Sequence, residues 1–161
     1  MTRVRVLFLP GVDADNTNAQ SLNVREIALR FDPDRLHSTL WYEREPDPRL
    51  RNREGIRLLP LPPRGKTFRI ATELLAGYDI IAYIDYSLAS YFFLHLPSVV
   101  RGRTKAVFHA EAPQAQMGNP SRGHQFLYRG IFLRCNVYTG ITEFVARDIH
   151  KSIKKKAAYV L

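Results

Sequence analysis

Short apolar runs alternate with amphipathic stretches along the 161 residues of this chain. The first run, from Val4 to Leu9, is rich in β-forming side chains and ends at Pro10-Gly11. Apolar runs of this length, bounded by turn residues, are typical of buried strands. The same reasoning predicts strands at residues 4–9, 37–42, 56–59, 80–85, 105–109, 136–139 and 157–161.

Between these runs, apolar residues recur at spacings of three and four, as on one face of a helix. Residues 24, 27, 28 and 31 show this pattern, and Thr17 with Gln20 fits a capping box before them. The predicted helices span residues 22–31, 67–76, 88–100, 125–134 and 142–153, and the third should kink or end at Pro97. The charged, proline-containing residues 43–54 are expected to form an exposed loop.

Apolar strands that alternate with helices indicate a parallel sheet covered on both faces. We therefore expect an α/β fold: a single Rossmann-like, doubly wound parallel sheet of about seven strands. In such sheets, ligands bind beyond the carboxyl ends of the strands, where the strand order reverses. The loops after Leu9, Ile84, Phe108 and Thr139 are therefore the places to look for a site.

The last predicted strand, residues 157–161, is apolar, and no residues follow it to cover its edge. We therefore expect residues 1–161 to form one domain of a two-domain protein. Its functional cleft would then have only one wall in this chain.

The chain carries 24 basic and 15 acidic residues, a net charge of +9 that predicts an anionic partner: nucleic acid, a membrane surface or a phosphorylated small molecule. The single cysteine, Cys135, favours the cytoplasm, and the start of the chain reads directly into a strand rather than a signal peptide. The sequence has no dinucleotide fingerprint, P-loop, nucleophile elbow or zinc-ligand spacing. We expect no metal site.

The candidate site residues stand at the predicted strand ends. The sharpest signal is His109 with Glu111, which would point the same way from one strand and could share a proton or hold a polyol. A hydrogen-bonded structural histidine is an equally good interpretation. Each of the other candidates has a binding and a structural interpretation, the latter as a turn or helix-capping residue. They are Gly11, Asn16, Thr17, Asp85, Tyr86 and Thr142.

Taken in order, these strand ends resemble the N-terminal half of a GT-B glycosyltransferase, specifically the retaining sugar-nucleotide enzymes of glycosyltransferase family 4. The matching segments cover essentially the whole chain. They are the opening strand with Pro10-Gly11, Asp79-Ile80-Ile81, Val107-Phe108-His109, Tyr138-Thr139-Gly140-Ile141-Thr142 and the final strand 158–161. The first loop carries residues 13–18 in place of the family's usual Gly-Gly pair.

The resemblance implies an acceptor-side domain, inactive by itself, whose missing C-terminal domain binds a nucleotide-diphosphate sugar as the donor substrate. It implies no metal and no cofactor in this chain. His109 would be the catalytic residue facing the transferred sugar. Gly11, Asn16, Thr17 and Thr142 would lie near the donor phosphates, and Asp85, Tyr86 and Glu111 near the acceptor. The positive charge fits an anionic acceptor, or peripheral contact with the inner face of a membrane.

One alternative of a different class stays open. The chain could be a stand-alone basic α/β module that binds nucleic acid or another anionic partner through residues such as Lys151, Lys154, Lys155 and Lys156. No known RNA- or DNA-recognition motif accompanies that charge, so nucleic acid is the less favoured partner.

Overall fold

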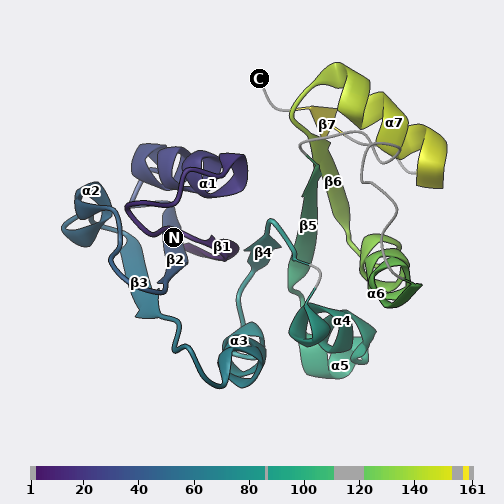
Figure 1. The fold of residues 1–161 in the computed structure, drawn as a ribbon, viewed down its shortest axis with the longest axis horizontal. Coiled ribbons are helices and arrows are strands. Elements are labelled where there is room, and N and C mark those ends of the chain that lie inside the picture. Colours follow the sequence, from purple (N-terminus) through teal and green to yellow (C-terminus); the bar gives the residue numbers. More distant parts are fainter. Residues whose placement is uncertain (1–2, 86, 111–121, 154–157, 160–161) are drawn as a thin grey trace.

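The computed structural model describes residues 3–85, 87–110, 122–153 and 158–159. Their core is one seven-stranded, fully parallel sheet of order β3-β2-β1-β4-β5-β6-β7 (Figure 1). The α/β class and the doubly wound sheet are therefore confirmed. The strands are β1 (Val4–Gly11), β2 (Leu36–Tyr42), β3 (Ile56–Pro60), β4 (Ile80–Ala82), β5 (Lys105–Ala110), β6 (Val137–Gly140) and β7 (Ala158–Tyr159).

Helices cover both faces of the sheet, and each face has its own hydrophobic core because side chains alternate along a strand. Val6 and Phe8 of β1 pack with α1 and α2 on one face, whereas Leu7 and Leu9 pack on the other. That second face carries α3, α4, α6 and α7. The helices are α1 (Ala19–Arg30), α2 (Pro48–Arg51), α3 (Lys66–Leu74), α4 (Leu88–His95), α5 (Ser98–Arg101), α6 (Arg122–Phe132) and α7 (Glu143–Ile153).

Two local predictions were wrong, both near helix starts. The cap of α1 is Asn18, whose side chain accepts a hydrogen bond from Ser21 N at 2.8 Å, so Thr17 and Gln20 form no capping box. The segment 43–54 is not simply an exposed loop, because it contains α2 with its buried Leu50. An aspartate cap followed by proline is a favoured helix start, and Asp47-Pro48 has that form.

Two other element boundaries have clear backbone causes. The helix predicted at 88–100 ends at His95, before Pro97, and a separate turn of helix, α5, follows. Strand β4 stops at Ala82 because Tyr83 has a left-handed backbone, with φ of +57°. An L-residue rarely adopts this conformation, and it cannot continue a strand.

The strand order reverses between β1 and β4, which are neighbours in the sheet although they are not consecutive in the chain. All strands are parallel, so the loops after β1, β4, β5 and β6 emerge at one edge and in adjacent positions. This is the arrangement in which doubly wound sheets bind ligands. Among the described residues, no helix is long and apolar enough to cross a membrane.

Candidate functional site

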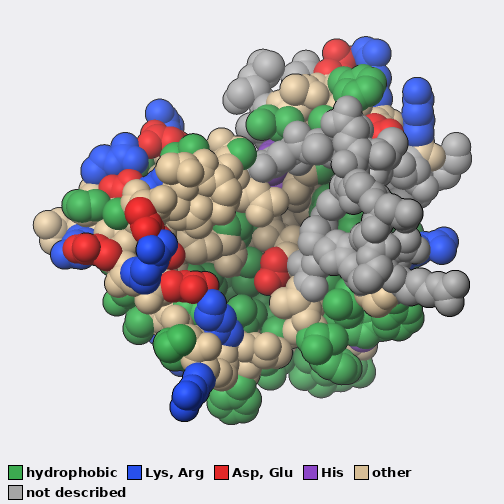
Figure 2. Space-filling model, viewed as in Figure 1, with side chains coloured by type: hydrophobic (Ala, Val, Ile, Leu, Met, Phe, Trp, Pro, Cys, Tyr) green, Lys and Arg blue, Asp and Glu red, His purple; other side chains and the backbone are tan. Residues whose placement is uncertain are grey.

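A pocket of about 300 Å³ lies beside α1 at the carboxyl ends of β4 and β5. Tyr83 and His109 come from these two strand ends, and Ile141 follows β6. One face of α1 supplies the facing wall through Asn23, Glu26, Ile27 and Arg30. In Figure 2 the surface is hollowed between α1 and the β5–β6 side of the sheet. The pocket therefore lies next to the position where the strand order reverses.

Among the predicted site residues that the structure describes, His109 alone lines this pocket. Its side chain is 9% exposed, and its Nδ1 lies 2.8 Å from Thr139 Oγ1 on the neighbouring strand. Burial lowers the pKa of His109, so the imidazole is neutral at pH 7. Its Nε2 is buried and has no hydrogen-bond partner among the described residues. A buried polar atom without a partner costs about 1–3 kcal/mol, which a bound hydroxyl or water would offset.

The ring of Tyr83 packs against the imidazole of His109. The two rings are 4.5 Å apart between centroids and tilted by 36°. The left-handed backbone at Tyr83 turns the chain out of β4 and leaves its ring on the α1 face, near Phe8. Strained backbone of this kind persists where the surrounding structure enforces it, and it is common at functional sites. Tyr83 thus fixes the position of the His109 ring.

The wall formed by α1 is polar and charged. Arg30 lies 2.6 Å from Glu26, and Arg49 of α2 lies 3.0 Å from the same carboxylate. Hydrogen bonds from both arginines lower the pKa of Glu26, which is therefore ionised at neutral pH. Asn23 adds an amide on the same helix face. The imidazole, the amide and the ion pair are the polar groups of a pocket that Ile27, Tyr83 and Ile141 otherwise line, so a ligand with both hydroxyl and apolar groups fits it.

The candidates in the loop before α1, Gly11, Asn16 and Thr17, do not line the pocket. Asn16 donates to Ser21 Oγ at 2.9 Å, and its side-chain oxygen accepts from Asn18. Thr17 is exposed. At Gly11 a Cβ atom would lie 3.3 Å from a carboxylate oxygen of Asp13, so the glycine makes room for that side chain.

The buried side chain of Arg25, in α1, holds this loop in place through hydrogen bonds to its backbone. Its guanidinium donates to the carbonyl oxygens of Asp13, Ala14 and Asn16, at 3.2, 3.2 and 2.8 Å. It also lies 3.6 Å from the Asp47 carboxylate. A planar guanidinium with several donors in fixed positions can hold several carbonyls at once. The loop shape therefore depends on one side chain of α1.

Of the other candidates, the structure describes Asp85 and Thr142, and neither lines the pocket. Asp85 Oδ1 accepts hydrogen bonds from Ser87 Oγ at 2.9 Å and from Ser90 Oγ, at the start of α4. Thr142 caps α7, because its Oγ1 accepts from Val145 N at 3.2 Å. Tyr86 and Glu111 lie outside the described residues, so their predicted roles stay predictions.

Sequence reasoning missed most of the pocket wall. Asn23, Glu26 and Arg30 are polar residues on one helix face, next to the apolar stripe that was recognised. Their spacing of three and four residues was the available signal. Thr139 pairs in register with His109, but strand neighbours cannot be assigned before the strand order is known.

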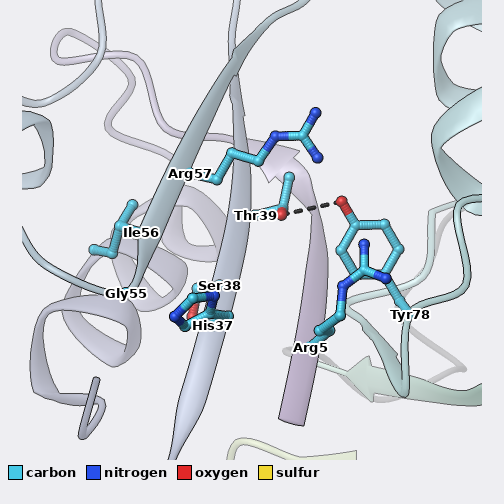
Figure 3. Close-up of a pocket in the computed structure, with 8 residues that line it drawn as sticks. All are labelled: Arg5, His37, Ser38, Thr39, Gly55, Ile56, Arg57 and Tyr78. Atoms are coloured by element: carbon cyan, nitrogen blue, oxygen red, sulfur yellow. Dashed lines mark hydrogen bonds between the residues drawn. The ribbon is translucent and has the colours of Figure 1, made fainter. Parts of the chain in front are cut away.

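A second cavity, of about 190 Å³, lies on the opposite face of the sheet, at the amino-terminal half of β1 to β3 (Figure 3). Its arginines are already engaged: Arg5 donates to the carbonyls of Ala76 and Gly77, and Arg57 lies 3.1 Å from Glu73. Tyr78 donates to Glu73, its hydroxyl lies 3.0 Å from Thr39 Oγ1, and Arg5 covers its ring at 4.8 Å. This cavity is lined by a structural network.

The described residues contain no cluster of three or more histidine, cysteine, aspartate or glutamate side chains that could hold a metal ion. No protein-family model matches the sequence, and a search of the curated proteins found no match. The likeness to family 4 glycosyltransferases thus rests on the strand-end residues alone, and any functional conclusion must come from the pocket itself.

Proposed function

We propose that this chain is the acceptor-side domain of a sugar-nucleotide-dependent glycosyltransferase, inactive by itself, in which His109 faces the transferred sugar. The observation that carries the proposal is the state of His109. It is neutral, held by Thr139 and Tyr83, and lines a pocket at the carboxyl edge of the sheet. Its Nε2 lacks a partner among the described residues.

A neutral imidazole in this position acts by orientation rather than by charge. The Thr139 hydroxyl donates its proton to the carbonyl oxygen of Phe108, which lies 3.4 Å from Thr139 Oγ1. The Thr139 oxygen then accepts from the Nδ1–H of His109, which leaves a lone pair on Nε2. That lone pair would accept a hydrogen bond from a sugar hydroxyl. This hydrogen bond would hold the transferred sugar in a reactive orientation.

The anionic part of the donor would lie near the helix starts at the same edge. Gly11, Asn16 and Thr17 precede α1, and Thr142 caps α7. Helix amino termini carry a partial positive charge and free N–H groups, which stabilise a diphosphate without a metal ion. A retaining mechanism, a second domain for the nucleotide, and an acceptor that is anionic or membrane-borne belong to the same proposal.

Calorimetric titration with UDP-glucose and with GDP-mannose tests the proposal. We expect weak, saturable binding of at least one nucleotide sugar, and His109→Ala should weaken it by about tenfold through the loss of one hydrogen bond and its oriented acceptor. His37→Ala is the matched control, because His37 is exposed and lies outside the pocket. Absence of binding to either sugar, or equal losses in both variants, would contradict the proposal.

The alternative of a nucleic-acid-binding module makes the opposite prediction. Single-stranded RNA would then bind with an affinity that falls steeply with salt, and His109→Ala would leave that affinity unchanged. The two outcomes are read from the same protein samples.

A further inference from the structure

Helices α4 and α6 carry a continuous group of aromatic side chains on their outer surface. The ring centroid of Tyr91 lies 5.8 Å from that of Phe92 on the same helix and 5.4 Å from that of Phe126 on α6. His95 stacks on Tyr91 at 4.0 Å. Phe92 and Phe126 are each 63% exposed. Soluble proteins seldom leave contiguous side chains of this size in water without a binding role.

The space between these two helices is a groove of about 500 Å³. Gly130 allows α4 and α6 to approach each other, because a Cβ atom there would overlap the ring of Tyr91. Phe126 and Leu133 both line the groove and are both exposed. They stand seven residues apart on α6, which is two helical turns, or about 10 Å along the axis. The groove therefore follows α6 for at least two turns.

The charge of the groove is positive and uncompensated. Arg129 and Arg134 line it, and neither forms an ion pair with another described residue. Residues 86–142 include six lysines and arginines but one acidic residue. On α2, by contrast, Arg51 pairs with Glu45 at 2.5 Å. The groove thus offers two free guanidinium groups beside its apolar side chains, and an occupant that supplies carboxylates would complement it.

We propose that the α4–α6 groove binds an amphipathic helix of a partner protein, with acidic side chains on both sides of its apolar stripe. A helix fits a groove between two others, and its apolar residues at i, i+4 and i+7 match the two-turn spacing of Phe126 and Leu133. Exposed aromatic residues and arginines are also the residue types that anchor protein interfaces.

Other occupants fit the groove less well. A second copy of this chain would bring the unpaired arginines of two basic surfaces together, and like charges across an interface are unfavourable. A nucleic acid would pair with Arg129 and Arg134 but would leave Leu133 without an apolar contact. The acidic helix alone satisfies both the charge and the apolar stripe. Its binding is separate from the chemistry at His109, which lies in a different pocket at the carboxyl edge of the sheet.

A displayed library of helical peptides, each of about four turns, tests this assignment. Every peptide has leucine or phenylalanine at the i, i+4 and i+7 positions, and glutamate, lysine or serine at random on both flanks of that stripe. We expect selection on the whole chain to enrich glutamate over lysine by about tenfold, because two exposed ion pairs each contribute a factor of about three. Arg129→Glu with Arg134→Glu should reverse the preference to lysine. Equal enrichment of both residues, an unchanged preference in the reversed variant, or no enriched peptide would overturn the proposal.

Fluorescence anisotropy of an enriched peptide then locates its binding site. Phe126→Ser should weaken binding by about thirtyfold, as expected for an aromatic anchor, and Arg129→Gln with Arg134→Gln by about tenfold. Phe144→Ser, which removes a phenylalanine of α7 that is 68% exposed, and Arg51→Gln on α2 are the matched controls and should bind like the wild type. Circular dichroism checks that every variant is folded. Equal losses in the controls would contradict the assignment to this groove.

The same variants reveal a different occupant. A concentration-dependent dimer that Phe126→Ser abolishes, with no peptide enriched, would identify the groove as a subunit contact and overturn the proposal. Binding of single-stranded RNA or anionic vesicles that Phe126→Ser abolishes, again with no peptide enriched, would overturn it as well. Nucleotide-sugar binding should be the same in all these variants, so failure of helix binding is distinguishable from failure of the function proposed for His109.

Discussion

His109 Nδ1 lies 2.8 Å from Thr139 Oγ1, across two strands that meet only because β5 and β6 pair in register. The contact fixes which ring nitrogen carries the proton, since Thr139 can donate to the carbonyl of Phe108. It therefore connects the strand pairing of the sheet to the chemistry of the pocket. The identity of the residue at position 139 should matter almost as much as that of His109.

Replacing Thr139 tests this connection. Thr139→Val keeps the shape but leaves Nδ1 of the buried imidazole without a partner, at a cost of about 1–3 kcal/mol in the free energy of unfolding. We expect a mixture of the two imidazole tautomers, seen in long-range ¹H–¹⁵N spectra. Thr139→Ser retains the hydroxyl and should retain a single tautomer. An unchanged tautomer in Thr139→Val would show that Thr139 does not determine it.

The buried imidazole should also make stability depend on pH. Burial lowers the pKa of His109 below its ordinary value of 6.5. Between the folded and the unfolded pKa, the unfolded chain binds more protons, so the free energy of unfolding falls as the pH drops through this window. His109→Gln should remove this part of the slope between pH 7 and pH 5, measured by urea unfolding. An imidazole that titrates at or above 6.5 in the native protein would refute the expectation.

The left-handed backbone of Tyr83 predicts that a glycine at this position gives a more stable protein than an alanine, the reverse of the usual order. Glycine normally destabilises a folded chain relative to alanine, but φ of +57° costs an L-residue about 1–2 kcal/mol. Tyr83→Gly and Tyr83→Ala both lose the ring that contacts His109, yet the glycine variant should be more stable by about 1 kcal/mol. Thermal unfolding compares the two. A more stable alanine variant would mean that position 83 is not left-handed.

Arg25 should be the most sensitive position of the loop before α1. Arg25→Met would leave the Asp13, Ala14 and Asn16 carbonyls without their donor and weaken the ion pairing of buried Asp47. Breaking a buried pair of this kind costs about 3–5 kcal/mol. Denaturant unfolding should show that loss for Arg25→Met, a smaller one for Arg25→Lys, and less than about 0.5 kcal/mol for the exposed Arg35→Met. Similar losses of unfolding free energy for the substitutions at positions 25 and 35 would show that Arg25 does not hold the loop in place.

Much of the architecture could be predicted because local patterns determine it. Every predicted strand is present, because each is a short apolar run between turn residues. The alternation of these strands with helices implied a parallel sheet. The cap at Asn18 and the helix α2 were missed for different reasons. Competing polar residues at 16–18 each fit a cap, and a single turn of helix carries no measurable periodicity.

The site was less predictable because it depends on relations between distant residues. His109 was identified from its place at a strand end, and the structure places it in the pocket. Its neighbours Tyr83 and Glu26 come from other elements, and only the strand order brings them close. The unusual backbone of Tyr83 leaves no mark in the sequence, because tyrosine is not a residue that favours a left-handed conformation.

The most direct test of the central claim is a long-range ¹H–¹⁵N spectrum of the His109 imidazole, recorded while UDP-glucose or GDP-mannose is added. The proposed function predicts a neutral ring with the proton on Nδ1, and a saturable shift of the Nε2 resonance as a sugar hydroxyl donates to it. The Thr139→Val variant should lose part of that response. A nucleotide sugar that binds without moving the Nε2 resonance of His109, or a ring that is charged at pH 7, would contradict the claim.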